Sequence, residues 1–346
     1  MLNKNLRYYR LKSAMSKKEV AESIHVTPMA ITHYENGDRV PNMETIKALA
    51  DVFEVRVSDF LMSHNLDITY QHEKFRKNAA LTKTQQEYVY VSVEDHFDRF
   101  MTAVEILGGE VLPEAPRLHQ IPLREDDEEN ARMLRLGLGF AEDGPIEDII
   151  GKLENKGILI YECDVRNNKF SGLNGLVNER PYIAFNAAMT PERNRSTMIH
   201  ELSHLMFSWP DDISAKDEEV RATAISGAFL FPKKDVVREL GVRRSAVSSD
   251  MILVAKEYGI SMMLLAKRAE QCGIISPSAA KDFYIQASKI GWRTAEPSRI
   301  VPEKPTLFRQ LVYRAVNEEN ISFQRGAELL GTSYDEIAAM CHFGEV

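Results

Sequence analysis

The sequence predicts a multidomain chain with an all-α N-terminal unit, a mixed α+β unit built on a small sheet, and a helical C-terminal module. Residues 1–64 contain apolar side chains at helical spacing and, between these segments, residues that favour helix caps. Strand-forming runs lie between residues 158 and 186, and the pattern after residue 250 is helical. A length of 346 residues exceeds a typical single domain, which agrees with several folded units.

The composition excludes several classes of protein. Hydrophobic residues make up 44% of the chain and charged residues 27%, as in globular proteins. No run of eighteen apolar residues exists, so no membrane span is expected, and the first twenty residues show no secretory signal. Cys163, Cys272 and Cys341 are far apart and odd in number, which favours a cytoplasmic location over a disulfide framework.

The net charge of −8 is unevenly distributed along the chain. Residues 1–64 hold nine basic and eight acidic side chains, a net charge of +1. The 34 basic and 43 acidic side chains of the remainder give −9. The acidity therefore lies outside the N-terminal unit, and the total charge does not exclude nucleic-acid binding by that unit.

Residues 1–64 carry the signals of short helices separated by turns. Apolar spacing predicts a first helix over residues 2–11. Ser16 is a good N-cap for the second helix, and Glu19 three residues later completes a capping-box pattern. Thr27 is a good N-cap for the third helix.

The ends of the third and fourth helices are also marked in the sequence. Pro28 suits the first position of the third helix, and Gly37 suits the position after its last turn. Asn42 caps a fourth helix that runs through residue 53, and a short last helix follows near residues 58–61. The second and third helices, joined by a tight turn, form a helix-turn-helix.

The N-terminal unit resembles the XRE family of phage-repressor-like DNA-binding domains over essentially all of residues 1–62. The matching residues are Arg10, Ser16, Glu19-Val20-Ala21, Val26-Thr27, Ile31, Tyr34-Glu35-Asn36-Gly37, Pro41 and the segment 49–53. The resemblance implies a homodimer on a double-stranded DNA operator, with the third helix in the major groove. It also implies a set of DNA contacts, with Lys17 on phosphate and the bases faced by Thr27, Met29, Ala30, Thr32 and His33.

Residues 65–124 are predicted to form a helical connector. Its pattern is helical over residues 88–107, and two glycines and three prolines then mark a loop-rich stretch. The acidic run 125–129 opens another helix, where the carboxylates favour the helix dipole or are simply solvated. A further helix is expected over residues 146–153.

Branched apolar residues predict strands over residues 158–165, 172–177 and 181–186. Residues 178–180 are short enough to join the last two strands as a hairpin. The strand over 172–177 is a candidate for binding an extended peptide by strand addition.

A helix that begins at Thr190 and Pro191 contains the motif His200-Glu201-Leu202-Ser203-His204. Residues four apart lie on one face of a helix, so both imidazoles can reach one tetrahedral ion. Glu201 is then placed to approach a water molecule as a base rather than to bind the ion. The alternative is a helix face with two histidines and no metal.

The third metal ligand is expected on the next helix, which begins near Asp217 and ends before Pro232. A catalytic zinc site has three protein ligands and one open position. Glu218 and Glu219 are both candidates for the third ligand. Two imidazoles and a carboxylate favour Zn²⁺, and Mn²⁺ and Fe²⁺ also suit that ligand set.

This order of strands, HExxH helix and glutamate-bearing helix resembles the ImmA/IrrE family of metallo-endopeptidases. Beside the HExxH motif, the matching residues are Gly144-Pro145-Ile146, Leu153-Glu154, Gly157-Ile158, Glu219, Ala222, Thr223, Ile225, Ser226, Phe229-Leu230 and Pro232. The register of the resemblance selects Glu219 over Glu218. Ile199, Ser203 and Thr223 replace the family's usual Ala, Gly and Asn, and none of these changes removes a ligand or the base.

The resemblance implies a zincin-like metallopeptidase domain over residues 125–296, after the DNA-binding domain over 1–64 and the connector over 65–124. In such a site zinc activates water and polarises the scissile carbonyl. Glu201 takes the proton and later delivers it to the leaving amine. The C-terminal helical module over 297–346 contains two helical stretches capped by Ser322 and Ser333.

Several residues have two interpretations, and the structural one is favoured for each. Glu35 is predicted to pair with Arg10 rather than to read DNA. Arg268 is predicted to form a surface ion pair rather than to bind a substrate carboxylate. The pair Cys341-His342 is a weak candidate for binding metal.

Three functions are compatible with the sequence. The first is a transcriptional regulator whose peptidase domain cleaves a repressor- or antitoxin-like protein, or the chain itself, in a stress or mobile-element response. The second is a non-catalytic transcription factor or antitoxin that uses its zinc domain as a sensor or scaffold. The third is a peptidase whose DNA-binding domain only determines its location.

Overall fold

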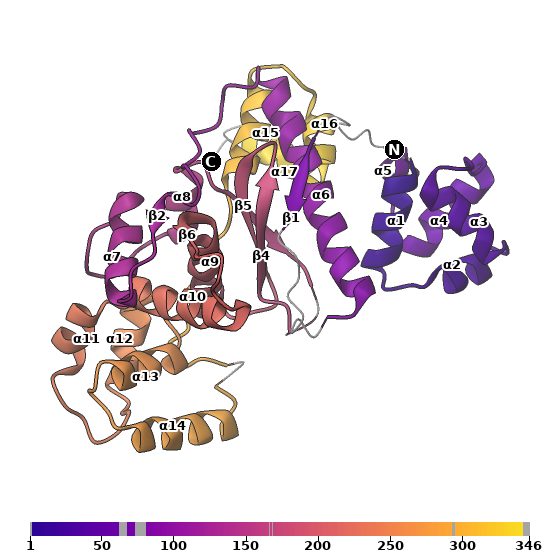
Figure 1. Cartoon of the computed structure of the whole chain (residues 1–346). Coiled ribbons are helices and arrows are strands. Elements are labelled where there is room, and N and C mark those ends of the chain that lie inside the picture. The colour runs from indigo at the N-terminus through magenta and orange to yellow at the C-terminus, as the bar shows by residue number, and fades with distance from the viewer. Residues whose placement is uncertain are drawn as a thin grey trace. The chain divides into compact units, whose positions relative to one another are not determined.

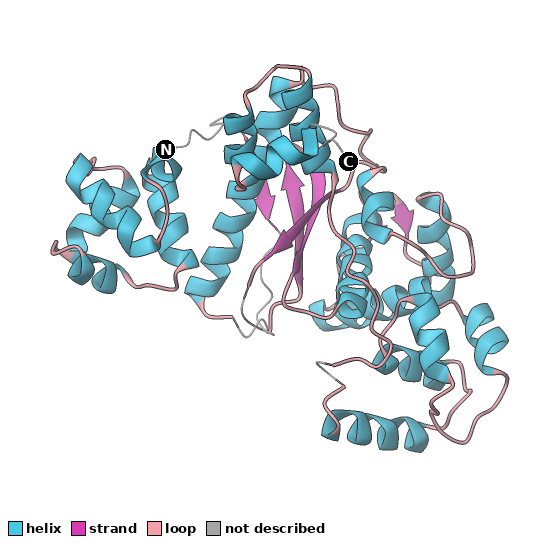
Figure 2. Cartoon of the chain, turned by 180° about the vertical axis from the view of Figure 1, so that it is seen from behind, coloured by secondary structure: helices cyan, strands magenta, loops and turns pink. Residues whose placement is uncertain are grey.

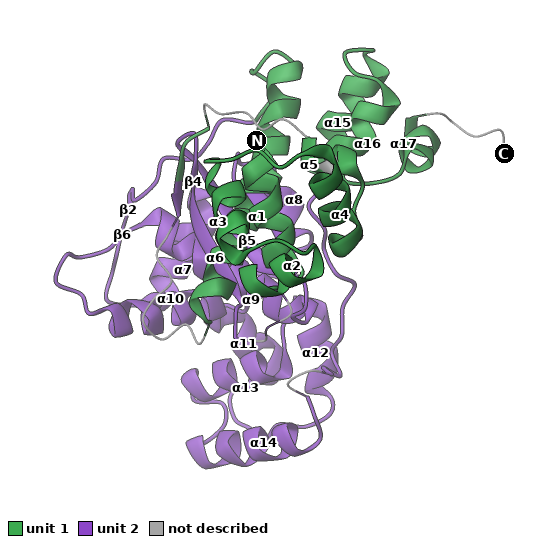
Figure 3. Ribbon diagram, turned by 90° about the vertical axis from the view of Figure 1, so that its right-hand side faces the viewer, with its two compact units in different colours: residues 1–70, 75–112, 306–346 green, residues 71–74, 113–305 purple. Residues whose placement is uncertain are grey.

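The computed structural model describes residues 2–61, 68–72, 81–165, 167, 169–292 and 295–341. The chain divides into two compact units, which Figure 3 shows in different colours. The first unit comprises residues 1–70, 75–112 and 306–346, and the second comprises residues 71–74 and 113–305. The predicted connector and the predicted C-terminal module are thus each divided between the two units.

The N-terminal part of the first unit is helical. It consists of α1 (Leu2–Lys12), α2 (Lys17–Ser23), α3 (Pro28–Asn36), α4 (Met43–Phe53) and α5 (Val57–Leu61), labelled in Figure 1. Ser16 and Glu19 form the expected capping box, and Thr27 caps α3. Gly37 follows α3 with a φ of 81°, a conformation that glycine adopts at little cost. The apolar faces of these helices meet in one core, which includes Leu6, Val20, Ile31, Leu49 and Phe60.

Arg10 and Glu35 form an ion pair inside this core. Two guanidinium nitrogens of Arg10 donate to the two carboxylate oxygens of Glu35, and a third donates to the carbonyl of Met15 at 3.1 Å. The two side chains are only 7% and 2% exposed. This pair confirms the structural interpretation of Glu35, because its carboxylate points into the domain.

Replacing Arg10 by Ala is expected to lower the free energy of local unfolding of α1–α3 by about 3 kcal/mol, since Glu35 would keep a buried charge without its main partner. Lys17 Nζ lies 3.3 Å from Glu35 and limits the loss. Hydrogen exchange of the α1 and α3 amides in the full chain measures the change. Arg7→Ala, which removes a more exposed ion pair with Glu87, is the control and should cost less than about 1 kcal/mol. Equal effects of the two substitutions would contradict the prediction.

The remainder of the first unit contains α6 (Lys83–Ile106), α15 (Leu307–Asn317), α16 (Phe323–Leu330) and α17 (Tyr334–Cys341). Thr82 and Gln85 form a capping box at the start of α6. Both α15 and α16 pack against α6, and Arg99 Nη1 donates to the carbonyl of Leu329 at 2.9 Å. The C-terminal segment forms three helices where two stretches were predicted, with Ser322 and Ser333 as the expected caps. His342 lies outside the described residues.

The second unit contains the predicted strands and two short additions. Its sheet has the order β1 (Tyr70–His72), β4 (Gly172–Val177), β5 (Arg180–Asn186) and β3 (Leu159–Cys163). The strands β4 and β5 are antiparallel, and β3 is parallel to β5. Figure 2 shows this sheet apart from the pair formed by β2 (Ile121–Pro122) and β6 (Phe207–Ser208). The strands β1 and β5 lie on the two sides of β4, so the strand predicted to bind an extended peptide by strand addition is not an edge of the sheet.

The helices of the second unit are α7 (Asp127–Gly137), α8 (Ile149–Glu154), α9 (Pro191–Met206), α10 (Ala215–Leu230), α11 (Lys233–Leu240), α12 (Met251–Tyr258), α13 (Met262–Gln271) and α14 (Pro277–Lys289). The central helix α9 packs against β4 and β5, and against α10 (Figure 1). Ile183 and Phe185 of the sheet share a core with Leu202 of α9 and Phe229 of α10. The α+β class predicted for this unit is confirmed.

Two buried arginines bind backbone carbonyls around α10. Arg135 is fully buried and donates to the carbonyls of Phe229, Ala141 and Gly144 at 2.7–3.0 Å. Burial lowers the pKa of Arg135 to about 10, so the guanidinium remains charged at neutral pH. Arg268 is 3% exposed and pairs with Glu128. The predicted ion pair of Arg268 is therefore present, but its guanidinium is buried rather than on the surface, while Glu128 is 29% exposed.

Within the described ranges, no helix has both the length and the apolar character needed to cross a membrane.

Candidate metal centre

The helix α9 presents two histidines on one face. Its N-terminus is fixed by Thr190, whose side chain accepts from the backbone N–H of Arg193, and by Pro191 at the first turn. His200 and His204 are one helical turn apart, and their Nε2 atoms are 3.2 Å from each other. Two Nε2 atoms at this separation can bind the same ion.

The helix α10 brings a carboxylate to the same point. Ser214 caps this helix, and Glu219 projects from it toward α9. One oxygen of Glu219 is 3.3 Å from His200 Nε2, and the other is 3.5 Å from His204 Nε2. His200, His204 and Glu219 form a group whose possible ligand atoms all lie within 4.8 Å of one another.

These distances fit a tetrahedral metal ion. Zinc–nitrogen bonds of 2.0–2.1 Å place the ligand atoms of a tetrahedron about 3.4 Å apart. The three separations between ligand atoms are 3.2, 3.3 and 3.5 Å. Three protein ligands at these positions would leave a fourth position open, as in a catalytic zinc site.

The second nitrogen of each imidazole also has a partner. His204 Nδ1 lies 2.8 Å from Glu218 Oε1, and His200 Nδ1 lies 3.3 Å from Thr223 Oγ1. Such partners fix the tautomer and the orientation of a metal-binding histidine. The geometry thus distinguishes the two glutamates that the sequence offered as the third ligand. Glu219 lies close to both Nε2 atoms, whereas Glu218 contacts Nδ1 of His204.

Replacing Glu218 by Ala is expected to weaken metal binding by about 10- to 100-fold, since His204 would lose the carboxylate that orients its ring. Competition with a chelator of known affinity measures the change. Glu257→Ala removes an exposed glutamate of α12 and should leave the affinity unchanged. An unchanged affinity in Glu218→Ala would show that the contact at Nδ1 does not support the ligand.

Glu201 follows His200 in the sequence, and a side chain of the sheet forms a hydrogen bond with its carboxylate. Asn174 Nδ2 of β4 donates to Glu201 Oε2 at 2.8 Å, and the Asn174 side chain is buried. A Cβ atom at Gly172 would lie 2.5 Å from Thr197 Cγ2 and 3.3 Å from Glu201 Cγ. Glycine at this position therefore lets β4 approach α9 closely enough for Asn174 to reach the carboxylate.

Sequence reasoning missed the roles of Asn174 and Glu218. Asparagine is uncommon in the interior of a strand, so Asn174 was a detectable signal. The role of Glu218 depends on the rotation of α10 relative to α9, which the sequence pattern does not define.

The residues predicted to contact DNA lie on α3 or near its N-terminus, except Lys17 on α2. Thr27, Met29 and His33 are exposed, and Ala30 and Thr32 are half-buried. Met29 is the most prominent apolar side chain of this set, at 62% exposure. Lys17 Nζ lies 3.3 Å from Glu35 and keeps 36% of its side chain exposed.

Two family models match separate parts of the chain. A helix-turn-helix family model matches residues 6–60, and a model described as the IrrE N-terminal-like domain matches residues 153–270. The HTH-type transcriptional activator BcrR of Enterococcus faecalis is 30% identical over 88 residues, which cover 25% of this chain and 41% of BcrR. The match thus spans less than half of that relative. No solved structure matches the chain at a significant level.

Proposed function

We propose that this chain, which joins an XRE-type helix-turn-helix domain to an IrrE N-terminal-like domain, is a DNA-binding transcriptional regulator with a metal-dependent endopeptidase activity. The observation that carries the proposal is the site on α9 and α10. Three ligand atoms are spaced for one ion, and a carboxylate adjoins them. The match to the helix-turn-helix model supports the regulatory half.

His200, His204 and Glu219 would hold the ion, with Zn²⁺ favoured and Mn²⁺ possible. A bound Zn²⁺ ion supplies Lewis-acid polarisation of the scissile carbonyl and activation of water. Glu201 takes the proton of the attacking water and returns it to the leaving amine. Asn174 orients this carboxylate by donating to one of its oxygens, which leaves the other oxygen for the proton transfer.

The helix-turn-helix domain provides the proposed DNA contacts. The exposed side chains of α3 would enter the major groove, and Lys17 would contact a phosphate near the start of α2. Domains of this kind bind paired half-sites as dimers, so we propose a homodimer on an operator.

The proposed peptidase substrate is a repressor- or antitoxin-like protein, or the chain itself, cleaved in a stress or mobile-element response. Incubation of the metal-loaded chain with repressors encoded beside it, followed by mass spectrometry, tests this proposal. A cut that a chelator prevents and that added Zn²⁺ restores is the expected result. If none of these proteins is cut, the second candidate is favoured, a non-catalytic regulator that retains the metal as a scaffold.

Replacing Met29 by Asp is expected to weaken operator binding by about 10- to 100-fold, because a carboxylate would replace an apolar contact and repel the phosphates. Fluorescence anisotropy measures the binding, with a DNA fragment that the full chain has selected from a random library. Met43→Asp is the matched control, since Met43 is 52% exposed in the same domain but lies on α4. An equal loss of DNA affinity in the two variants would show that α3 is not part of the DNA-binding interface.

A further inference from the structure

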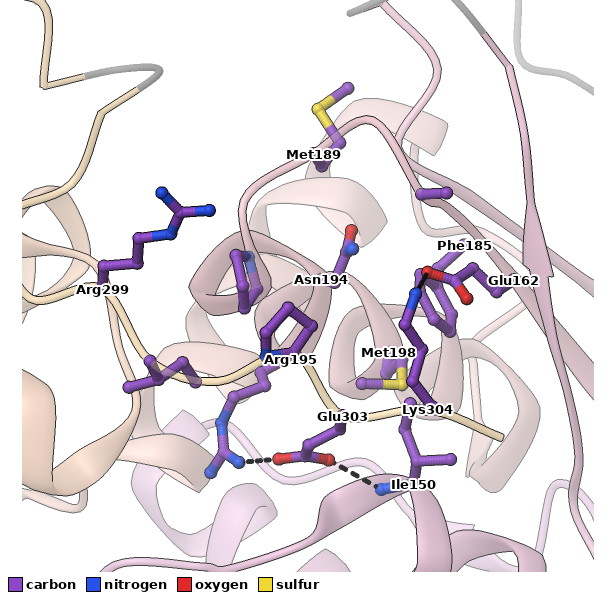
Figure 4. A pocket seen from close by; sticks show the side chains of 14 residues that line it. Ile150, Glu162, Phe185, Met189, Asn194, Arg195, Met198, Arg299, Glu303 and Lys304 are labelled. Carbon is purple, nitrogen blue, oxygen red and sulfur yellow. Dashed lines mark hydrogen bonds and ion pairs between the residues drawn. The ribbon is translucent and has the colours of Figure 1, made fainter. Parts of the chain in front are cut away.

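The second unit contains a pocket of about 180 Å³, shown in Figure 4. None of His200, His204 and Glu219 lines it. Its α9 wall consists of Pro191, Asn194, Arg195 and Met198, which occupy positions i, i+3, i+4 and i+7 and thus one helix face. The positions of His200 and His204 lie on the opposite face of the same helix. The segment 299–304 forms a second wall, and we call it the strap.

The strap is tied to its surroundings by hydrogen bonds and ion pairs. Glu303 pairs with Arg195 and accepts from the backbone N–H of Ile150 at 2.9 Å (Figure 4). The backbone N–H of Ile300 donates to Glu192 at 2.8 Å. These contacts hold the strap against the N-terminal half of α9, the helix whose C-terminal half carries the histidines.

The pocket combines apolar walls with one uncompensated positive charge. Its apolar surface includes Phe185, Met189 and Met198. Arg195 is paired with Glu303, and Lys304 is paired with Glu162. Arg299 also lines the pocket, and its exposed guanidinium has no hydrogen bond or ion pair with the described residues.

Asn194 supplies a polar group inside the pocket that the protein itself does not satisfy. The residue is 8% exposed, and its Oδ1 atom is buried with no hydrogen-bond partner among the described residues. A buried amide without a partner is unfavourable, and such groups in folded proteins usually have a protein, water or ligand partner. A carboxylate only accepts hydrogen bonds, so it can bond at this position once the amide is rotated by 180°, which places the NH₂ donor where Oδ1 has no partner.

We propose that this pocket binds a small monocarboxylate that carries an apolar group about the size of a benzene ring. An apolar cavity of about 150 Å³ is large enough for benzene, so a ligand of this size fits the volume. The apolar group packs against the methionines and Phe185, and the carboxylate pairs with Arg299 and accepts from the amide of Asn194. The ligand then contacts both the strap and α9.

Isothermal titration of the full chain with benzoate tests the proposal, with benzyl alcohol as the uncharged ligand. Benzoate is expected to bind with a millimolar or tighter Kd, and benzyl alcohol about tenfold more weakly. A repeat in the presence of EDTA excludes binding of the carboxylate to a metal at the histidines. The same Kd is expected there, because the two sites lie on opposite faces of α9.

Variants locate the binding site. Arg299→Ala and Asn194→Leu are each expected to weaken benzoate binding by about tenfold. Arg243→Ala removes another exposed arginine of the same unit and should leave the Kd unchanged. Arg299 is exposed, so the Arg299→Ala variant should fold normally. This variant therefore still tests the proposal if Asn194→Leu unfolds. The proposal is overturned if benzoate does not bind, if EDTA abolishes binding, or if Arg299→Ala binds benzoate as the unchanged chain does.

Discussion

Replacing Glu201 by Gln is expected to lower the rate of peptide-bond cleavage by about 10²- to 10⁴-fold, the range of a lost general base. The amide retains the shape of the side chain and still contacts Asn174, but it does not accept a proton from water. Glu201 is not one of the three residues whose atoms converge as ligands, so the variant should bind metal as the unchanged chain does. The defect should therefore appear in kcat and not in metal content.

Single-turnover cleavage of an identified protein substrate, followed by mass spectrometry, measures this effect. Glu257→Gln is the control, since it makes the same chemical change at an exposed position on α12. Full activity is expected in the control. A fully active Glu201→Gln variant would assign the proton transfer to another group.

Replacing His204 by Asn is expected to weaken metal binding by more than about 100-fold, which exceeds the usual effect of losing a residue that only supports a ligand. His204 contributes one of the three closely spaced ligand atoms, and its ring also connects Glu218 to the site. Metal analysis of the purified chain after dialysis against a weak chelator measures the stoichiometry. We expect about one ion for the unchanged chain and nearly none for the variant.

His119→Asn is the matched control for this experiment. His119 belongs to the same unit, and its Nδ1 atom lies 3.1 Å from the carbonyl oxygen of Phe207, away from the three ligand atoms. The control should keep its ion. If both variants retain a full complement of metal, the ion is bound elsewhere in the chain.

Local signals explain why much of the helical structure was predictable. Ser16, Thr27 and Thr190 were identified as N-caps from residue type and spacing, and each accepts the expected backbone hydrogen bond. Caps depend on chemistry within one turn, so the sequence contains the information. The helix expected over residues 146–153 begins later, at Ile149, because Asp148 adopts a φ of 47° and caps it there.

Contacts between distant segments were less predictable. The strand β1 is three residues long and lies in a polar stretch, so no alternation of apolar residues marks it. Arg268 and Glu128 are far apart in the sequence, and only the packing of the helices brings them together. The ligand set was predictable because two ligands come from one helical turn, whereas Asn174 approaches Glu201 from a strand.

X-ray absorption spectroscopy of the full chain loaded with one Zn²⁺ ion tests the central claim most directly, since it reports the atoms around the ion. The proposed centre predicts two imidazole nitrogens at about 2.0–2.1 Å and carboxylate or water oxygens at about 2.0–2.2 Å, with no sulfur. The same spectrum is expected for Glu201→Gln. A sulfur ligand at about 2.3 Å, or a spectrum unchanged by His204→Asn, would contradict a metal centre formed by His200, His204 and Glu219.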